Sequence, residues 1–238
     1  MRIDTSKRSD APEIMDDFNL EGEILRDALD KIAHINRLLG GNKVTLQGLK
    51  WLLKAKAHGH TTITILDVGC GNGDMLRVLA DYALKNQLDF KLIGIDANKF
   101  TVKHAQQLST AYANISYRCV DIFEEIKQDE IYDVILCTLT LHHFRDDEIR
   151  TLMNGFKKQS ALGIVVNDLH RSALACYLFL ALCFVFRLNH MSREDGLVSI
   201  LRGFKKSELE TLSQELNINS YLLKWKWAFR YQWIINTI

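Results

Sequence analysis

The chain has 238 residues, of which 47% are hydrophobic and 25% are charged, and its formal net charge at pH 7 is +1. This length suits one α/β domain with a full core and is too short for two domains of ordinary size. Because a nearly neutral chain lacks the basicity of most nucleic-acid-binding proteins, we expect no nucleic-acid partner.

The N-terminal part of the chain predicts two helices. Residues 1–12 show no regular pattern, whereas residues 13–39 place apolar side chains at helical spacing and stop at two glycines. Residues 45–57 predict a second helix, and residues 59–62 predict a loop that leads into the first strand.

We expect residues 1–45 to form a helical cap and residues 46–238 to form one globular domain. Residues 1–8 are polar and hold no apolar segment of a secretory signal. The five cysteines show no C-x-x-C spacing, and four of them lie in apolar runs, which indicates reduced thiols. Together these patterns predict a cytoplasmic protein.

An apolar strand at residues 63–68 runs into a turn with three alternate glycines, Gly69, Gly71 and Gly73. Glycines permit positive φ angles and let a ligand approach the backbone closely, and the apolar spacing of residues 75–85 predicts a helix after the turn. This order of strand, loop and helix predicts a cofactor-binding turn.

The charges around this turn favour a cationic ligand. Asp67 and Asp74 would place negative charge beside a pyrophosphate, and Asp74 stands where the dinucleotide fingerprint needs its third glycine. No Gly-Lys-Ser/Thr of a P-loop follows. S-adenosylmethionine, which carries a sulfonium and an ammonium group, suits the turn better.

The next two strands end in side chains that suit a nucleoside. The strand at residues 90–96 ends in Asp96, about 20 residues beyond the glycines, where a carboxylate can accept both ribose hydroxyls. After a third strand at residues 115–120, Asp121 can accept from an exocyclic amine while Ile122 covers the purine face. For both acids, capping of the following helix is the alternative role.

A fourth strand at residues 132–137 should form the floor of the cofactor site. It leads into Thr138 and then into His142-His143-Phe144. A helix at residues 146–158 precedes a fifth strand at residues 161–166, which continues into Asn167-Asp168-Leu169-His170. Because ligands gather at the carboxyl ends of parallel strands, both segments should face the site.

In this order the motifs resemble the class I S-adenosylmethionine-dependent methyltransferases, over roughly residues 60–170. The resemblance implies an α/β fold with a doubly wound, mostly parallel seven-stranded sheet, an antiparallel C-terminal strand and, here, an N-terminal helical cap. It also implies S-adenosylmethionine as cofactor, with contacts at Asp67, Gly69, Gly71, Gly73, Asp96, Ala97, Asp121, Ile122 and Thr138.

The His142-His143-Phe144 segment is similar to the small-molecule branch of that family, which includes quinone and polyketide methyltransferases. Members that methylate exocyclic amines carry Asn/Asp-Pro-Pro-aromatic after this strand, whereas the only proline here is Pro12. Together with the long apolar stretch at residues 173–186, this predicts O-methylation of a hydrophobic, phenolic or polyketide-like acceptor. C-methylation of a quinone precursor and a non-catalytic S-adenosylmethionine-binding protein stay open as alternatives.

Residues 35–41 are similar to an N-terminal segment that closes over the cofactor in some bacterial small-molecule methyltransferases, and core packing is the alternative role.

Few catalytic residues are expected, because transfer from a sulfonium needs mainly alignment of the acceptor and exclusion of water. A phenol with a pKa of about 10 needs a base, and a histidine with a pKa of about 6.5 can take its proton. The candidates are His170, His142 and His143, with His190 as a fourth.

We favour His170 among these histidines. Asp168 could orient it and Arg171 could stabilise a phenolate, and pairing of Asp168 with Arg171 is the alternative. The segment Asn167-Asp168 is also similar to the acid-amide strand end of metal-dependent catechol methyltransferases. Those enzymes have an aspartate after strand four, where this chain has Thr138 and Thr140, so the sequence predicts no metal.

Residues 173–186 are apolar or aromatic throughout. A membrane helix needs about 20 apolar residues, so we expect no stable membrane insertion and predict a helix that lines the acceptor pocket. Core packing and contact with a membrane surface are the alternatives. A homodimer also stays open.

The C-terminal third predicts a lid-like connection at residues 188–204, then a helix that starts with a capping box at residues 207–210 and ends near Leu216. Apolar and basic residues alternate at residues 223–227, and apolar residues repeat that period over residues 231–235, which predicts two paired strands rather than a nucleic-acid platform.

Overall fold

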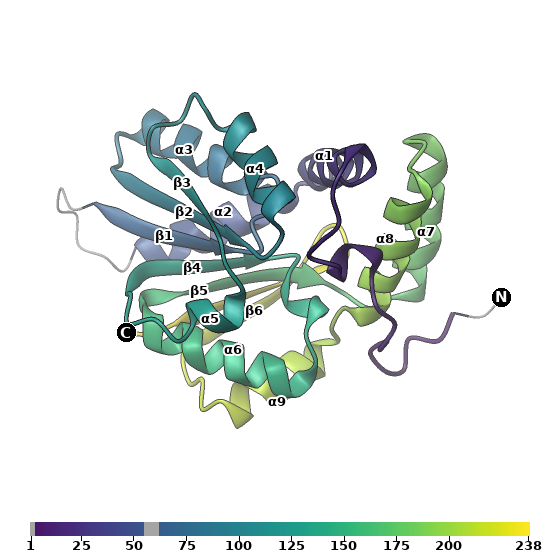
Figure 1. The fold of residues 1–238 in the computed structure, drawn as a ribbon. Coiled ribbons are helices and arrows are strands. Elements are labelled where there is room, and N and C mark those ends of the chain that lie inside the picture. Colours follow the sequence, from purple (N-terminus) through teal and green to yellow (C-terminus); the bar gives the residue numbers. More distant parts are fainter. Residues whose placement is uncertain (1–2, 55–61) are drawn as a thin grey trace.

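The computed structural model describes residues 3–54 and 62–238, and a sheet of seven strands lies at the centre of this described part (Figure 1). The strand order is β3-β2-β1-β4-β5-β7-β6. Strands β1 to β5 pair in parallel, and β7 is antiparallel to both of its neighbours. The predicted fold is therefore confirmed. The strands are β1 Ile63–Val68, β2 Phe90–Asp96, β3 Ile115–Cys119, β4 Tyr132–Thr138, β5 Ser160–Leu169, β6 Tyr221–Lys226 and β7 Arg230–Asn236.

Helices cover both faces of the sheet, as a doubly wound fold requires (Figure 1). One face carries α2 Gly41–Leu53, α3 Asp74–Asn86 and α4 Lys99–Leu108, and the other carries α5 Ile122–Glu125, α6 Asp146–Gln159 and α9 Lys206–Glu215. A further group, α1 Glu23–Leu38, α7 Ala173–Val185 and α8 His190–Arg202, lies beyond one end of the sheet.

The central strands supply two hydrophobic cores, one on each side of the sheet. In β1, Leu66 and Val68 pack toward α6 and α9, while Ile63 and Ile65 pack toward α2 and α3. Strands buried on both faces need continuous apolar runs, which explains why β1, β2 and β4 lack polar alternation. Each fully buried aliphatic side chain of this kind contributes about 1.5–3 kcal/mol.

The N-terminal helix predicted over residues 13–39 is two elements. A short 3-10 helix, η1 Ile14–Asp16, is separated from α1, which begins after Gly22 at a φ of 98°. Asp17 and Asn19 form a turn in the gap, where Asp17 Oδ1 accepts from the backbone N–H of Asn19 at 2.9 Å. The helical spacing of apolar residues holds only within α1.

The second helix, α2, begins at Gly41 instead of residue 45 and therefore crosses the predicted boundary between cap and domain, which stays a prediction. The end of that predicted helix at residues 55–57 lies outside the described residues, as do residues 59–61 of the predicted loop.

The predicted lid-like connection at residues 188–204 is mostly helical, because α8 occupies residues 190–202 of it. Asn189 caps this helix by accepting from the backbone N–H of Ser192 at 2.8 Å. The sequence pattern did not predict this helix because its composition is mixed. Helix α8 packs against α7 on one side and presents polar side chains to a cavity on another.

In the C-terminal part, the start of helix α9 differs from the prediction, and the predicted pair of strands is present. Helix α9 begins two residues early, because its N-cap is Lys205 and not Ser207, and Glu208 accepts from the backbone N–H of Lys205 at 2.7 Å. The predicted strand pair is present as β6 and β7.

All five cysteines are free. None of the helices in the described ranges combines the length and apolarity needed to cross a bilayer.

Candidate active site

A cavity of about 940 Å³ opens at the carboxyl ends of the parallel strands. It is bounded on the other side by α1, α7 and α8, the helix group beyond the end of the sheet (Figure 1). The predicted cofactor contacts other than Gly73 line this cavity, and so do His142, His143 and His170. The order of strand ends in the sequence therefore predicted residues that lie around one cavity.

The glycines of the turn have different structural roles. At Gly71, where φ is +52°, a Cβ would meet only Leu29 at 3.9 Å, so the backbone faces open space that a ligand can enter. At Gly73, where φ is +76°, a Cβ would lie 2.0 Å from the hydroxyl of Tyr117, so packing against β3 requires glycine. Gly73 thus shapes the turn from outside the cavity.

Two buried acids lie under the turn. Burial, and then the charge of Asp96, raises the pKa of Asp67 to about 7. Burial also raises the pKa of Asp96, opposed by backbone N–H groups of Asn98 at 3.0 Å and Gly71 at 3.2 Å, which both donate to it. Two carboxyls that resist ionisation together favour a cation beside them.

Asp96 and Asp121 differ in the helix-capping role that was their alternative. Asn98 caps α4, so Asp96 is not the cap of that helix. Asp121 does cap α5 through the backbone N–H of Phe123 at 2.7 Å, and it also lines the cavity.

The acidic charge of Asp74 is turned toward the N-terminal helices. Its carboxylate accepts from Arg37 and from Asn42 Nδ2, the latter at 2.6 Å. These bonds tie α1 and α2 to the glycine turn. Residues 35–41 both pack and contribute to the cavity wall, through Ile35, Asn36 and Leu39.

Asp168 orients His142 and not His170, which corrects the sequence prediction. The His142 ring bonds through Nδ1 to Asp168 Oδ1 at 2.6 Å, and the His142 backbone N–H donates to Asp168 Oδ2 at 3.1 Å. Burial opposes ionisation of Asp168, but the charge of His142 and these bonds hold its pKa below the ordinary value. His142 is 2% exposed and lines the cavity, and its Nε2 lies 3.7 Å from Glu13 Oε1.

The surroundings of His170 differ from those predicted. His170 Nδ1 accepts from Trp225 Nε1 at 3.2 Å, and burial, followed by the charges of Lys205 and Arg171, lowers its pKa. Arg171 is fully buried and pairs with Glu208 at 2.5 Å, so it pairs with neither a phenolate nor Asp168. The fourth candidate, His190, lies on the surface beside Glu194 at 3.0 Å.

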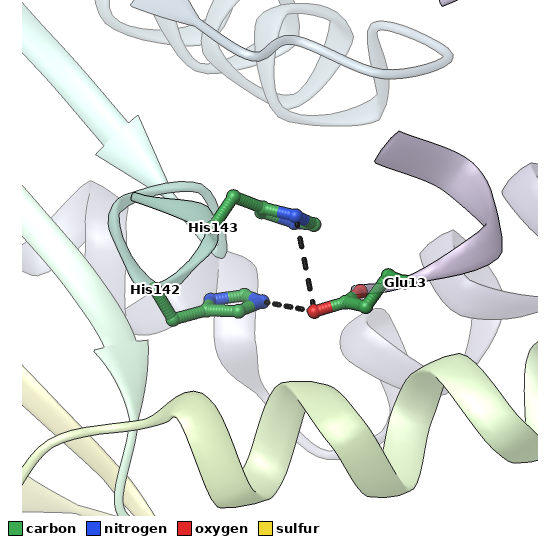
Figure 2. Close-up of side chains that lie close together, drawn as sticks. All are labelled: Glu13, His142 and His143. Atoms are coloured by element: carbon green, nitrogen blue, oxygen red, sulfur yellow. Dashed lines mark ion pairs between the residues drawn. The ribbon is translucent and has the colours of Figure 1, made fainter. Parts of the chain in front are cut away.

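Glu13, which sequence reasoning missed, reaches the two histidines after β4 from the N-terminal segment (Figure 2). Burial raises its pKa to about 7, against the effects of His143, Ser199 and Arg202. The segment is held in place by Arg8, which donates to the carbonyls of His142 and Phe144 at 3.0 and 2.9 Å. No local motif marks Glu13, because its partners are distant in sequence.

The remainder of the cavity is largely apolar. Helix α7 lines it as predicted, through Ala175, Leu178, Phe179, Ala181, Leu182 and Val185. Arg230 is a second residue that the sequence did not reveal. Burial lowers its pKa to about 10, and its Nε and Nη1 have no hydrogen-bond partner among the described residues.

Comparisons with known proteins match this chain to methyltransferases. Residues 60–171 match the model of a methyltransferase-domain family. A ubiquinone biosynthesis O-methyltransferase from Rickettsia prowazekii (strain Madrid E) is 26% identical over 188 residues, which cover 77% of this chain and 69% of that protein. Residues 60–171 therefore form a methyltransferase domain, and S-adenosylmethionine is its methyl donor.

Other relatives of this methyltransferase match shorter stretches or the fold alone. A ubiquinone biosynthesis O-methyltransferase from Coxiella burnetii (strain Dugway 5J108-111) is 35% identical over 85 residues, covering 35% of this chain and 34% of that protein. The structure of the plantazolicin methyltransferase BpumL in complex with SAH superposes with a TM-score of 0.68 at 16% identity, covering 90% of this chain and 93% of that chain. The shared fold thus extends well beyond the matched domain.

Proposed function

We propose that this methyltransferase transfers the methyl group of S-adenosylmethionine to an oxygen of a hydrophobic small molecule of phenolic or polyketide-like type. The observation that carries the proposal is a single cavity that joins the strand ends of a methyltransferase sheet to an apolar chamber and a cluster of Glu13, His142 and His143. The Rickettsia relative is a ubiquinone biosynthesis O-methyltransferase, which supports oxygen as the acceptor atom.

The cofactor would lie along the strand ends. We assign Asp96 to the ribose hydroxyls, Asp121 and Ile122 to the adenine, and Asp67 to the electrostatic attraction of the cation. The remaining contacts are assigned to Gly69, Gly71, Ala97 and Thr138, with Gly73 shaping the turn.

The acceptor would occupy the chamber beside α7, with its hydroxyl at the cluster of Glu13, His142 and His143. Besides alignment of the acceptor, the reaction needs removal of the hydroxyl proton. This cluster can take that proton from the acceptor oxygen. His170 also lines the cavity, and we expect it to contact the acceptor. As the oxygen attacks the methyl carbon, the carbon–sulfur bond breaks and S-adenosylhomocysteine leaves as a neutral thioether.

Methyl-labelled S-adenosylmethionine and a panel of phenols, catechols and aromatic polyketides test this function. Mass spectrometry is expected to find one labelled methyl group on an acceptor, and NMR is expected to place it on oxygen. A methyl group on ring carbon would favour C-methylation. Cofactor binding without any methylated acceptor would favour a non-catalytic binding protein.

The same assay includes Asp96→Asn as a cofactor-site variant. Loss of a charged hydrogen-bond acceptor should weaken cofactor binding by about 2 kcal/mol. The exposed Asp147→Asn serves as a matched control, and unchanged affinity in Asp96→Asn would remove Asp96 from the cofactor site.

A further inference from the structure

Three potential ligand atoms converge in the wall of the cavity, as Figure 2 shows. Glu13 Oε1 lies 3.7 Å from His142 Nε2 and 3.8 Å from His143 Nδ1, and all three atoms lie within 4.8 Å of one another. Bonds of about 2.0–2.2 Å from one ion to nitrogen and oxygen place its ligands about 3–4 Å apart. The cluster therefore has nearly the size of a metal site.

Two of these atoms are buried without a hydrogen-bond partner in the described residues, namely His142 Nε2 and Glu13 Oε1. His142 is 2% and Glu13 is 6% exposed, so both side chains are buried. Unpaired buried polar atoms cost free energy, and the two side chains point toward each other (Figure 2). A cation between them would satisfy both.

Each of these two side chains is fixed by a partner on its far side. Because Asp168 accepts at 2.6 Å from His142 Nδ1, the proton of the neutral ring lies on Nδ1 and the lone pair lies on Nε2. Ser199 donates to Glu13 Oε2 at 2.7 Å, which leaves Oε1 for the cluster. A carboxylate behind a ligating histidine is the usual outer partner in metal sites.

We infer that Glu13, His142 and His143 bind one divalent transition-metal ion, of the Zn²⁺ or Fe²⁺ type. Two imidazoles and one carboxylate with open positions toward a cavity suit these ions, whereas Mg²⁺ and Ca²⁺ prefer oxygen ligands. This departs from the expectation of no metal, which considered the ends of strands four and five and not the N-terminal segment.

Binding of an ion would require a change at His143, the third ligand, while Arg202 is the positively charged side chain next to the site. His143 Nδ1 now bonds to Asp16 Oδ1 at 2.8 Å, so the ion would replace the proton of that bond. Arg202 approaches Glu13 Oε1 to 3.7 Å but bonds to Asp16 Oδ2 at 2.7 Å, so its charge is directed mainly to Asp16.

The catalytic use of the ion rests on the proposed function. An acceptor hydroxyl that coordinates the ion loses its proton to solvent more readily, because the metal lowers the pKa of the bound oxygen. The resulting oxygen anion then takes the methyl group, and the electron pair of the broken carbon–sulfur bond stays on sulfur.

The test uses the full-length chain without a histidine tag, stripped by a chelator and titrated with Zn²⁺ in a calorimeter. We expect one Zn²⁺ per chain, bound at least about 100-fold more weakly by E13Q and by H143Q. H190Q removes an exposed histidine outside the cavity and should bind as the wild type does. Circular dichroism checks that each variant is folded.

A second measurement needs no variant. Crystals of the zinc-loaded chain, measured on both sides of the zinc absorption edge, should show one anomalous peak about 2 Å from His142 Nε2. Equal Zn²⁺ binding in the wild type and E13Q, or a peak elsewhere, would overturn the site.

Failure of the metal inference and failure of the proposed function give different results. Full-rate methylation of a phenol by the stripped chain refutes the role of the ion and keeps the proposed function. An ion at the cluster of a chain that methylates no acceptor keeps the site and removes the proposed function.

Discussion

At the scale of single residues, Asp67 connects pH to cofactor binding. Its pKa is raised to about 7 by burial and by Asp96, so the folded chain keeps this proton at pH values where the unfolded chain has lost it. Its contribution to the free energy of unfolding therefore falls as the pH rises from about 4 to about 7 and is constant above that.

Affinity for S-adenosylmethionine should change in the opposite direction. Because the cation prefers an ionised Asp67, its affinity should rise about 10-fold between about pH 6 and pH 8. Calorimetry at several pH values on the wild type and Asp67→Asn checks this, since the titration of the ligand's own amine is common to both. An identical pH profile in the variant would exclude Asp67 as the cause.

Alanine substitutions at Gly71 and Gly73 should affect cofactor binding and stability to different extents. Gly71→Ala meets open space, so it should weaken cofactor binding while costing about 1 kcal/mol of stability for its positive φ. Gly73→Ala should cost more stability, because its Cβ would collide with Tyr117. Cofactor titration and urea unfolding of both variants measure the two effects, and equal stability losses would contradict this assignment.

At the scale of elements, Arg171 joins the end of β5 to α9 and to the N-terminal segment. Besides Glu208, it donates to the carbonyls of Gly203 at 2.6 Å and Thr5 at 3.0 Å. Arg171→Met should lower the free energy of unfolding by about 3–5 kcal/mol, because it leaves these acceptors unpaired. Chemical unfolding checks this value.

The control for that prediction is Arg150→Met, which breaks an exposed pair with Glu215 and should cost at most about 1 kcal/mol. A stable Arg171→Met variant that loses activity alone would instead return Arg171 to the acceptor site.

Helix α7 has two faces whose roles can be distinguished. Leu182 lines the cavity, whereas Phe184 is 88% exposed on the outer face. Leu182→Glu should raise the acceptor KM about 10-fold or more, since an apolar acceptor would meet a carboxylate, and should leave cofactor affinity unchanged. Phe184→Glu is the matched control. Steady-state kinetics decide this, and equal effects of the two changes would contradict the pocket role.

The sequence predicted some helices and strands more accurately than others. Strands β1, β2 and β4 were predicted within a residue or two, because a long apolar run bounded by polar turns permits few other structures. Helix α8 and the division between η1 and α1 were missed. Both depend on packing against partners in the helix group, which no local period encodes.

At the scale of the whole molecule, the cavity exists because the N-terminal segment and α8 close over the strand ends. Glu13 and Ser199 meet there although they are 186 residues apart, and His142 meets Asp168 across 26 residues. Cytoplasmic residence and a homodimer remain predictions.

The sequence by itself determined the sheet through the spacing of its apolar strands, and it predicted where the cofactor binds from Asp67, Asp96 and the glycine turn. Only the tertiary structure decided which histidine Asp168 orients and that Glu13 belongs to the site. Such pairs form between side chains from different elements, and their distances depend on how those elements pack, which spacing along the chain does not contain.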